Sequence, residues 1–165
     1  MKRLVLLVTL LVTPVALAQT GLEGPDAGRM FLSTGLLVSA SKRPGEVTPG
    51  IGAELSIHGY PSKGLGVGVF GQWQSMELEH HRFASGMQFS YSLAGFELGA
   101  AHERGTGERA ATTLLHVAPY ASIGVATLAL RFGIPLHTAD NGLPGYGYDV
   151  GLTLALKVPL PLQGP

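Results

Sequence analysis

Hydrophobic and polar residues alternate along most of the chain after residue 28. The stretch 146–160 shows this most clearly, because every second residue from Tyr148 to Leu160 is apolar and the residues between them are small, polar or charged. Side chains of a β-strand point alternately to opposite faces of the sheet. The period of two therefore predicts a strand with one apolar and one polar face.

Seven further stretches show the same alternation, so the sequence predicts eight strands. The predicted strands cover residues 29–40, 51–60, 65–74, 83–93, 96–101, 112–123, 127–134 and 146–160. No helical period intervenes, so we expect neighbouring strands to pair as antiparallel hairpins. Long and short connections alternate, which places four long polar loops at one rim: 41–50, 75–82, 102–111 and 135–145.

Prolines refine two of these predictions, because proline cannot donate a ladder hydrogen bond. Pro44 and Pro49 place their segment in the first long loop. Pro119 lies inside a predicted strand, where it favours a β-bulge.

The first residues follow a different pattern. Lys2 and Arg3 precede an apolar run at 4–12, and residues 16–18 read Ala-Leu-Ala, which is the layout of a secretory signal peptide with its cleavage site. No later run reaches the ~18–20 apolar residues of a transmembrane helix. The predicted organisation is a signal peptide at 1–18, a periplasmic leader at 19–28, a barrel at 29–160 and a C-terminal tail at 161–165.

Composition narrows the class of protein. Lys plus Arg and Asp plus Glu both number 11, so no global basic field favours nucleic acid as a partner. The chain has no cysteine, which excludes disulfides, thiol nucleophiles and cysteine metal sites. Charged residues make up only 13% of the chain, against about 25% in a typical soluble domain. Few charges are therefore left to cover a soluble exterior.

The polar face of the predicted strands consists mostly of Gly, Ser and Ala with isolated charges. Small residues suit the narrow interior of an eight-stranded barrel, where large groups must be few and charges must pair. We therefore predict an all-β, eight-stranded antiparallel up-and-down transmembrane β-barrel with its apolar face toward lipid. The predicted interior polar network comprises Glu54, His58, Gln72, Gln88, Glu97, His116, Arg131, Asp149 and Lys157. The predicted membrane-interface aromatics are Trp73, Tyr91 and Tyr148.

In architecture the chain resembles the small eight-stranded outer-membrane barrels of Gram-negative bacteria, of the OmpA/OmpX type. The resemblance covers residues 29–160 and depends on the signal at 1–18, the eight alternating segments and the order of the loops. It implies a place in the outer membrane with both termini periplasmic, with lipid and the barrel-insertion machinery as partners. The expected role is structural or interactive, through four long extracellular loops, without catalysis, cofactor or metal.

Two other functions stay open. The segment 137–141, His-Thr-Ala-Asp-Asn, faintly resembles a motif of the outer-membrane lipid A deacylases, but Ala139 occupies the position of their nucleophilic serine. A soluble, lipocalin-like carrier would use the apolar face as a ligand cavity.

Two short motifs match patterns of dinucleotide or metal binding, but the residues around them do not support either function. The glycines of 66–71 match a dinucleotide fingerprint, but no helix follows them. Glu77, Glu79, His80 and His81 offer metal-ligand chemistry in one predicted loop, without a second cluster to complete a site.

Overall fold

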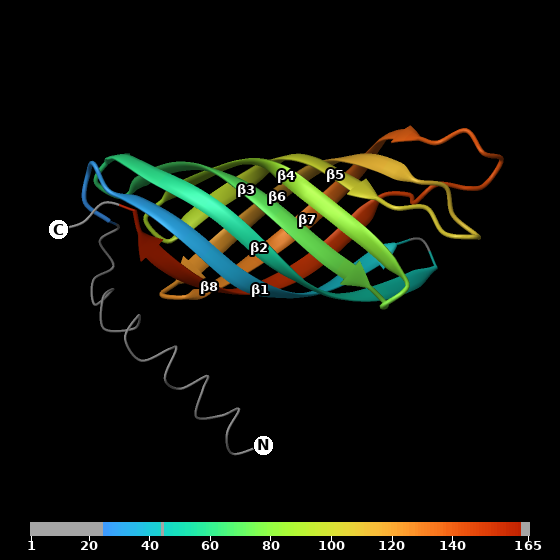
Figure 1. The fold of residues 1–165 in the computed structure, drawn as a ribbon, viewed down its shortest axis with the longest axis horizontal. Coiled ribbons are helices and arrows are strands. Elements are labelled where there is room, and N and C mark those ends of the chain that lie inside the picture. Colours follow the sequence, from blue (N-terminus) through green and yellow to red (C-terminus); the bar gives the residue numbers. More distant parts are fainter. Residues whose placement is uncertain (1–24, 44, 163–165) are drawn as a thin grey trace, which may run out of the picture.

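The structure is a computed structural model that describes residues 25–43 and 45–162. Eight strands form a closed barrel in which each strand pairs with its neighbours in sequence and β1 pairs with β8 (Figure 1). Every pairing between these strands is antiparallel. The strands are β1 (Met30–Arg43), β2 (Glu46–Ser62), β3 (Leu65–Met76), β4 (His80–Tyr91), β5 (Ala94–Glu103), β6 (Thr112–Ile123), β7 (Ala126–Thr138) and β8 (Asp149–Pro161). The prediction of an eight-stranded antiparallel up-and-down barrel is confirmed.

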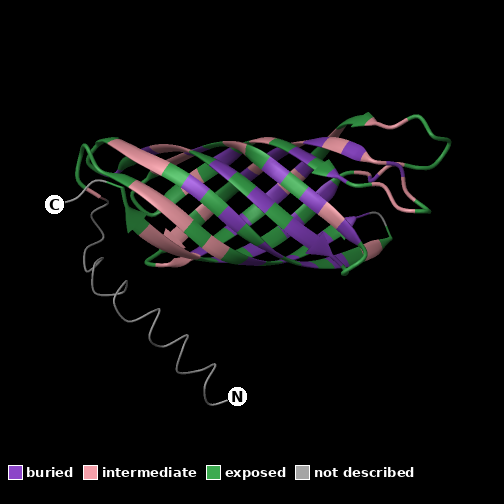
Figure 2. Ribbon diagram, in the orientation of Figure 1, coloured by how far each residue is buried: buried purple, intermediate pink, exposed green. Residues whose placement is uncertain are grey.

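Burial alternates along the strands and gives the barrel wall a chequered appearance (Figure 2). In β8, Leu152 and Leu154 are about half exposed on the outer face, at 52% and 47%, whereas Thr153 between them is 5% exposed. Glycine provides room where the inner face is most crowded. Gly86 and Gly99 pair across β4 and β5, and a Cβ on either would collide with the backbone of the other strand.

The two rims of the barrel differ. β1 begins and β8 ends at the same rim, which we call the terminal rim, where the connections 63–64, 92–93 and 124–125 are tight (Figure 1). The opposite rim, which we call the loop rim, carries the four connections that the sequence predicted to be long. Only 104–111 and 139–148 are long, since β2 starts at Glu46, soon after β1 ends, and 77–79 alone link β3 to β4.

The prediction of four long loops is therefore wrong for the first two. The strands continue through charged residues that resemble loop composition, and their charged side chains on the inner face are neutralised inside the barrel. Glu77 and Leu78 have φ values of 53° and 62°, which closes the tight β3–β4 turn.

Both proline predictions need correction. Pro49 lies within β2, exposed on the outer face and opposite Ala40, so it belongs to the ladder and not to a loop. At Pro119 the pairing of β6 with β7 is interrupted, but the register is the same on both sides. The register shift lies instead between Thr113 and Leu114, near the loop rim.

The predicted signal peptide, residues 1–18, lies outside the described residues, as do 19–24 of the leader and 163–165 of the tail. Within 25–43 and 45–162, the structure has no helix long and apolar enough to span a membrane.

Candidate functional site

The nine residues of the predicted interior network all lie on the inner face. Seven of them are buried, and Glu54, Glu97, His116, Arg131 and Asp149 are each 3% exposed or less. Lys157 and His58 are half-buried and lie toward the terminal rim. No hydrogen bond joins His58 to the other eight among the described residues, and its ring instead covers Gly68 on β3. The remaining residues divide into two clusters at different levels of the barrel.

The cluster nearer the terminal rim, which we call the acidic cluster, consists of Glu54, Gln72, Gln88, Glu97 and Lys157. Lys157 Nζ lies 2.5 Å from Glu54 Oε1. The amide of Gln72 donates to Glu54 at 3.2 Å and to Glu97 at 3.1 Å. The amide of Gln88 donates to the same two carboxylates, at 3.3 and 2.5 Å. Two carboxylates are thus held by one ammonium and two amides, from strands β2, β3, β4, β5 and β8.

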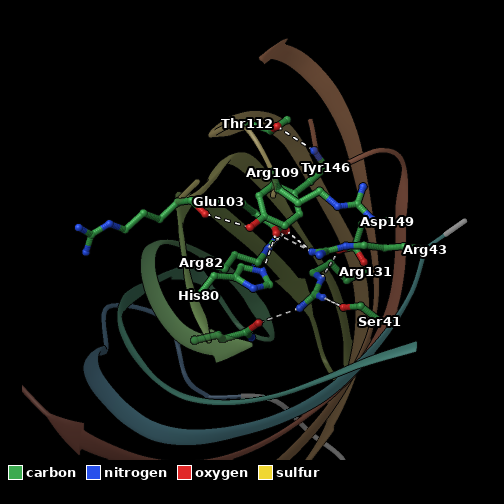
Figure 3. A network of polar contacts seen from close by, with 12 residues as sticks. Ser41, Arg43, His80, Arg82, Glu103, Arg109, Thr112, Arg131, Tyr146 and Asp149 are labelled. Carbon is green, nitrogen blue, oxygen red and sulfur yellow. Dashed lines mark hydrogen bonds and ion pairs between the residues drawn. The ribbon is translucent and has the colours of Figure 1, made fainter. Parts of the chain in front are cut away.

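The cluster nearer the loop rim, which we call the arginine cluster, has Glu103 at one centre. Arg43 Nη2 donates to both carboxylate oxygens of Glu103, at 2.5 and 2.6 Å. His80 Nε2 lies 3.2 Å from the same carboxylate, and Arg82 Nε lies 3.7 Å from it. All four side chains are at least nine-tenths buried, so this is a desolvated charge group supplied by β1, β4 and β5 (Figure 3).

Arg131 is the second centre of the arginine cluster. Its Nε donates to Asp149 at 3.0 Å, its Nη1 donates to Gln74 at 2.9 Å, and its Nη2 donates to Ser41. The fork geometry of a guanidinium lets one side chain tie together four strands, β1, β3, β7 and β8.

His116 connects the two clusters. Its Nδ1 lies 3.0 Å from Arg82 Nη2 and its Nε2 lies 3.0 Å from Glu97. A guanidinium can only donate, so Nδ1 accepts and Nε2 carries the proton that is donated to Glu97. The neutral tautomer of His116 can therefore accept from Arg82 and donate to Glu97 at the same time.

The buried charges balance only when the two clusters are taken together. The arginine cluster has three arginines and two carboxylates, and the acidic cluster has two carboxylates and one lysine. With the histidines neutral, an excess positive charge near one rim is matched by an excess negative charge near the other. The polar interior is thus one network that extends along the barrel.

Tyr146 closes the loop rim. The chain 144–148 turns into the mouth, where the ring of Tyr146 is 3% exposed, stacks on His80 at 4.8 Å between centroids, and lies 4.9 Å from Arg43 Cζ (Figure 3). Its hydroxyl donates to the carbonyl of Arg104 at 3.1 Å, and its amide donates to Thr112 Oγ1 at 3.0 Å. Burial raises the pKa of the Tyr146 phenol, so it stays a donor at neutral pH.

Five interior residues are not predicted from the sequence, because four of them lie in predicted loops and the fifth lies at the start of the last predicted strand: Arg43, His80, Arg82, Glu103 and Tyr146. The alternation contained a signal for them. Arg43 continues the parity of Ser39 and Ser41, and Glu103 continues that of Glu97 and Ala101. For Tyr146 the prediction is wrong, because the last strand begins at Asp149 and not at 146, and the inward position of Tyr146 results from the path of a loop.

The predicted interface aromatics lie on the outer face. Trp73, Tyr91 and Tyr148 are 42%, 71% and 67% exposed. Tyr91 ends β4 at the terminal rim, whereas Trp73 lies in the half of β3 nearer the loop rim and Tyr148 directly precedes β8 at that rim.

The remaining candidate motifs do not form sites in the described part of the chain. His80 points inward and His81 outward, so the predicted loop ligands diverge, and no group of three or more potential metal ligands occurs there. Gly66, Gly68 and Gly71 lie within β3. His137 is exposed on β7 opposite Thr113, and Ala139 follows the end of that strand.

Fold and interior together define a closed eight-stranded barrel with a charged, filled core and an apolar exterior. The void between the two clusters holds only about 10 Å³, which is about the space of one water molecule. Comparisons with protein-family models, curated proteins and solved structures found no match for this chain.

Proposed function

We propose that the protein is a small outer-membrane β-barrel without enzymatic activity, exported through the signal peptide at 1–18 and inserted with both termini periplasmic. Its role is structural or interactive, and the connections 104–111 and 139–148 are its extracellular contact surface. Lipid and the barrel-insertion machinery are its expected partners.

The reversed distribution of polarity carries this proposal. Large apolar residues on the outer face are exposed, such as Leu36 at 69% and Leu55 at 54%, whereas charges such as Arg82 and Glu103 are fully buried. In water this arrangement has two free-energy costs: the exposed apolar surface is hydrated, and the buried charges lose their hydration. In a bilayer the apolar surface meets hydrocarbon, and a closed barrel leaves no strand edge unpaired.

The filled interior argues against two other roles. A carrier for an apolar ligand needs an apolar cavity, whereas this core is occupied by paired charges and a void of about 10 Å³. A diffusion pore needs a continuous channel, and the network of Glu54, Glu97, Arg82 and Glu103 blocks the axis at two levels.

The lipid-modifying enzyme remains the rival from another class. Its base would be His137, and its nucleophile would have to differ from the family pattern at Ala139. If replacement of His137 by alanine abolished a measured lipid acyl-hydrolase activity in the folded protein, the non-enzymatic proposal would fail.

Cell fractionation with gel mobility of heated and unheated samples tests the proposal. We expect the full-length protein in the outer-membrane fraction, resistant to extraction by salt and urea, soluble only in detergent, and with a mobility that changes on heating. Recovery in the aqueous periplasmic fraction without detergent would contradict it. Solute flux through vesicles containing the protein should equal that of empty vesicles, since the interior is closed.

A further inference from the structure

An apolar groove lies on the outer face, at the seam between β7 and β8 on the loop rim. The groove holds about 250 Å³ and is lined by Val117, Phe132, Gly133, Ile134, Tyr148, Asp149 and Val150. Except for Gly133 and the buried Asp149, which is paired with Arg131, the lining is apolar or aromatic.

The groove exists because the two strands separate at that level. The last pair between β7 and β8 is Gly133 with Asp149, although β7 continues to Thr138. The residues that precede Asp149 turn toward the barrel axis, and Tyr146 among them closes the mouth of the barrel. The inward turn leaves an open gap on the outside, beside Ile134.

Cationic and polar groups border the groove at the rim. Lys42 pairs with Val150 across the β1–β8 seam, is exposed, and has no acidic partner within the described residues. On the other side His137 is exposed on β7, and Tyr148 presents a 67% exposed ring. An anionic group beside Lys42 would thus lie next to Val150, which lines the apolar cleft.

We propose that this groove binds one acyl chain of a lipid whose phosphate headgroup contacts Lys42, with His137 and the Tyr148 phenol as further donors. The inference depends on the proposed membrane location, in which the rim of the apolar surface is where headgroups lie. A cation with no acidic partner in the described part of the chain and an adjoining apolar cleft match the phosphate and the acyl chain of such a lipid. A soluble phosphate would use only the first part, and a neutral lipid only the second.

Native mass spectrometry of the full-length barrel in detergent, titrated with three probes, tests the inference. The probes are dioleoyl phosphatidic acid, dioleoylglycerol and glycerol 3-phosphate. We expect one bound phosphatidic acid at concentrations where neither of the others binds. Equal binding of dioleoylglycerol would overturn the phosphate contact, and equal binding of glycerol 3-phosphate would overturn the acyl groove.

Variants place the site. Lys42→Gln should weaken phosphatidic acid binding about tenfold, the size expected for loss of one charge-assisted hydrogen bond. Arg104→Gln removes an exposed cation from the same rim, but it follows β5, which contributes no residue to the groove, and should leave binding within about twofold. Equal losses in both variants would show diffuse attraction by the rim and overturn the site.

Val150→Trp fills the groove from β8 and should abolish the single tight binding event while heat-dependent mobility remains. Retained binding in this folded variant would overturn the inference. If the protein is soluble without detergent, both this inference and the proposed function are contradicted. If the barrel requires detergent but shows no preference for phosphatidic acid, only the inference is contradicted.

Discussion

The two halves of the barrel interior hold charge in different ways. Near the loop rim, guanidinium groups from three strands bind two carboxylates, and each arginine contacts more than one partner. Near the terminal rim, two carboxylates share one lysine, and the amides of Gln72 and Gln88 supply most of the hydrogen bonds. Each half alone would leave one charge uncompensated in a desolvated space.

The difference shows that the unit of stability is the whole interior and not the individual ion pair. His116 joins the halves by accepting from Arg82 and donating to Glu97. A buried pair is costly to break because the remaining partner keeps its desolvation cost. The expected loss of stability depends on how many buried partners each substitution leaves unpaired. Unfolding is measured by urea titration of the barrel in lipid vesicles. The single tryptophan, Trp73, reports the loss of the lipid environment.

The largest effect is expected for Arg82→Met. This change leaves Glu103 without one of its two arginine neighbours and His116 Nδ1 without its donor. The free energy of unfolding should fall by about 3–5 kcal/mol. As a control, Arg104→Met at the exposed rim should change it by less than about 0.5 kcal/mol. Similar losses for both variants would contradict the assignment of Arg82 to a buried network.

Lys157→Met breaks the other half and should cost less, about 2–4 kcal/mol, because the side chain is 14% exposed and water relieves part of the unpaired charge on Glu54. Adding Glu54→Gln should restore about 1–2 kcal/mol by removing that charge. If Glu54→Gln destabilises the Lys157→Met variant as much as it destabilises the unsubstituted protein, the two side chains are not coupled.

His116→Leu tests the connection between the halves. The change removes one acceptor and one donor in a volume-matched way and should cost about 1–3 kcal/mol. A double-mutant cycle of His116→Leu with Arg82→Met should give a coupling of at least about 0.5 kcal/mol. Additive effects would mean that the two clusters are independent.

The smallest effect is expected for Tyr146→Phe. It keeps the stack on His80 and removes only the hydrogen bond to the carbonyl of Arg104, so the cost should be about 0.5–1.5 kcal/mol. Tyr91→Phe, on the outer face at the terminal rim, is the matched control and should be close to neutral. An equal loss of stability in the control would mean that removal of any tyrosine hydroxyl has this cost, and that the effect does not come from closure of the mouth.

Most of the barrel could be predicted from the period of two, because one face of each strand meets a different environment from the other. The ends of the strands could not. Composition rules assign runs such as 80–82 and 102–104 to loops, whereas here every second charge faces inward and finds a partner on another strand. Those partners are far apart in sequence, as Arg43 and Glu103 show with a separation of 60 residues.

The interior residues divide in the same way. Glu54, Glu97 and Arg131 lie in the middle of strands, where parity alone predicts which face they occupy. Tyr146 lies in a connection, and no period predicts where a loop residue points. Its position depends on Thr112 and the carbonyl of Arg104, which only the closed barrel brings within reach.

The seam between β1 and β8 joins the first strand to the last, from Phe31 with Pro161 to Lys42 with Val150. A chain without β8 has two open edges, and in the proposed membrane location hydrocarbon would offer their amides and carbonyls no partner. Closure of the barrel therefore requires the first and last strands together, and in that location open intermediates would have to be kept from both lipid and one another until β8 is available.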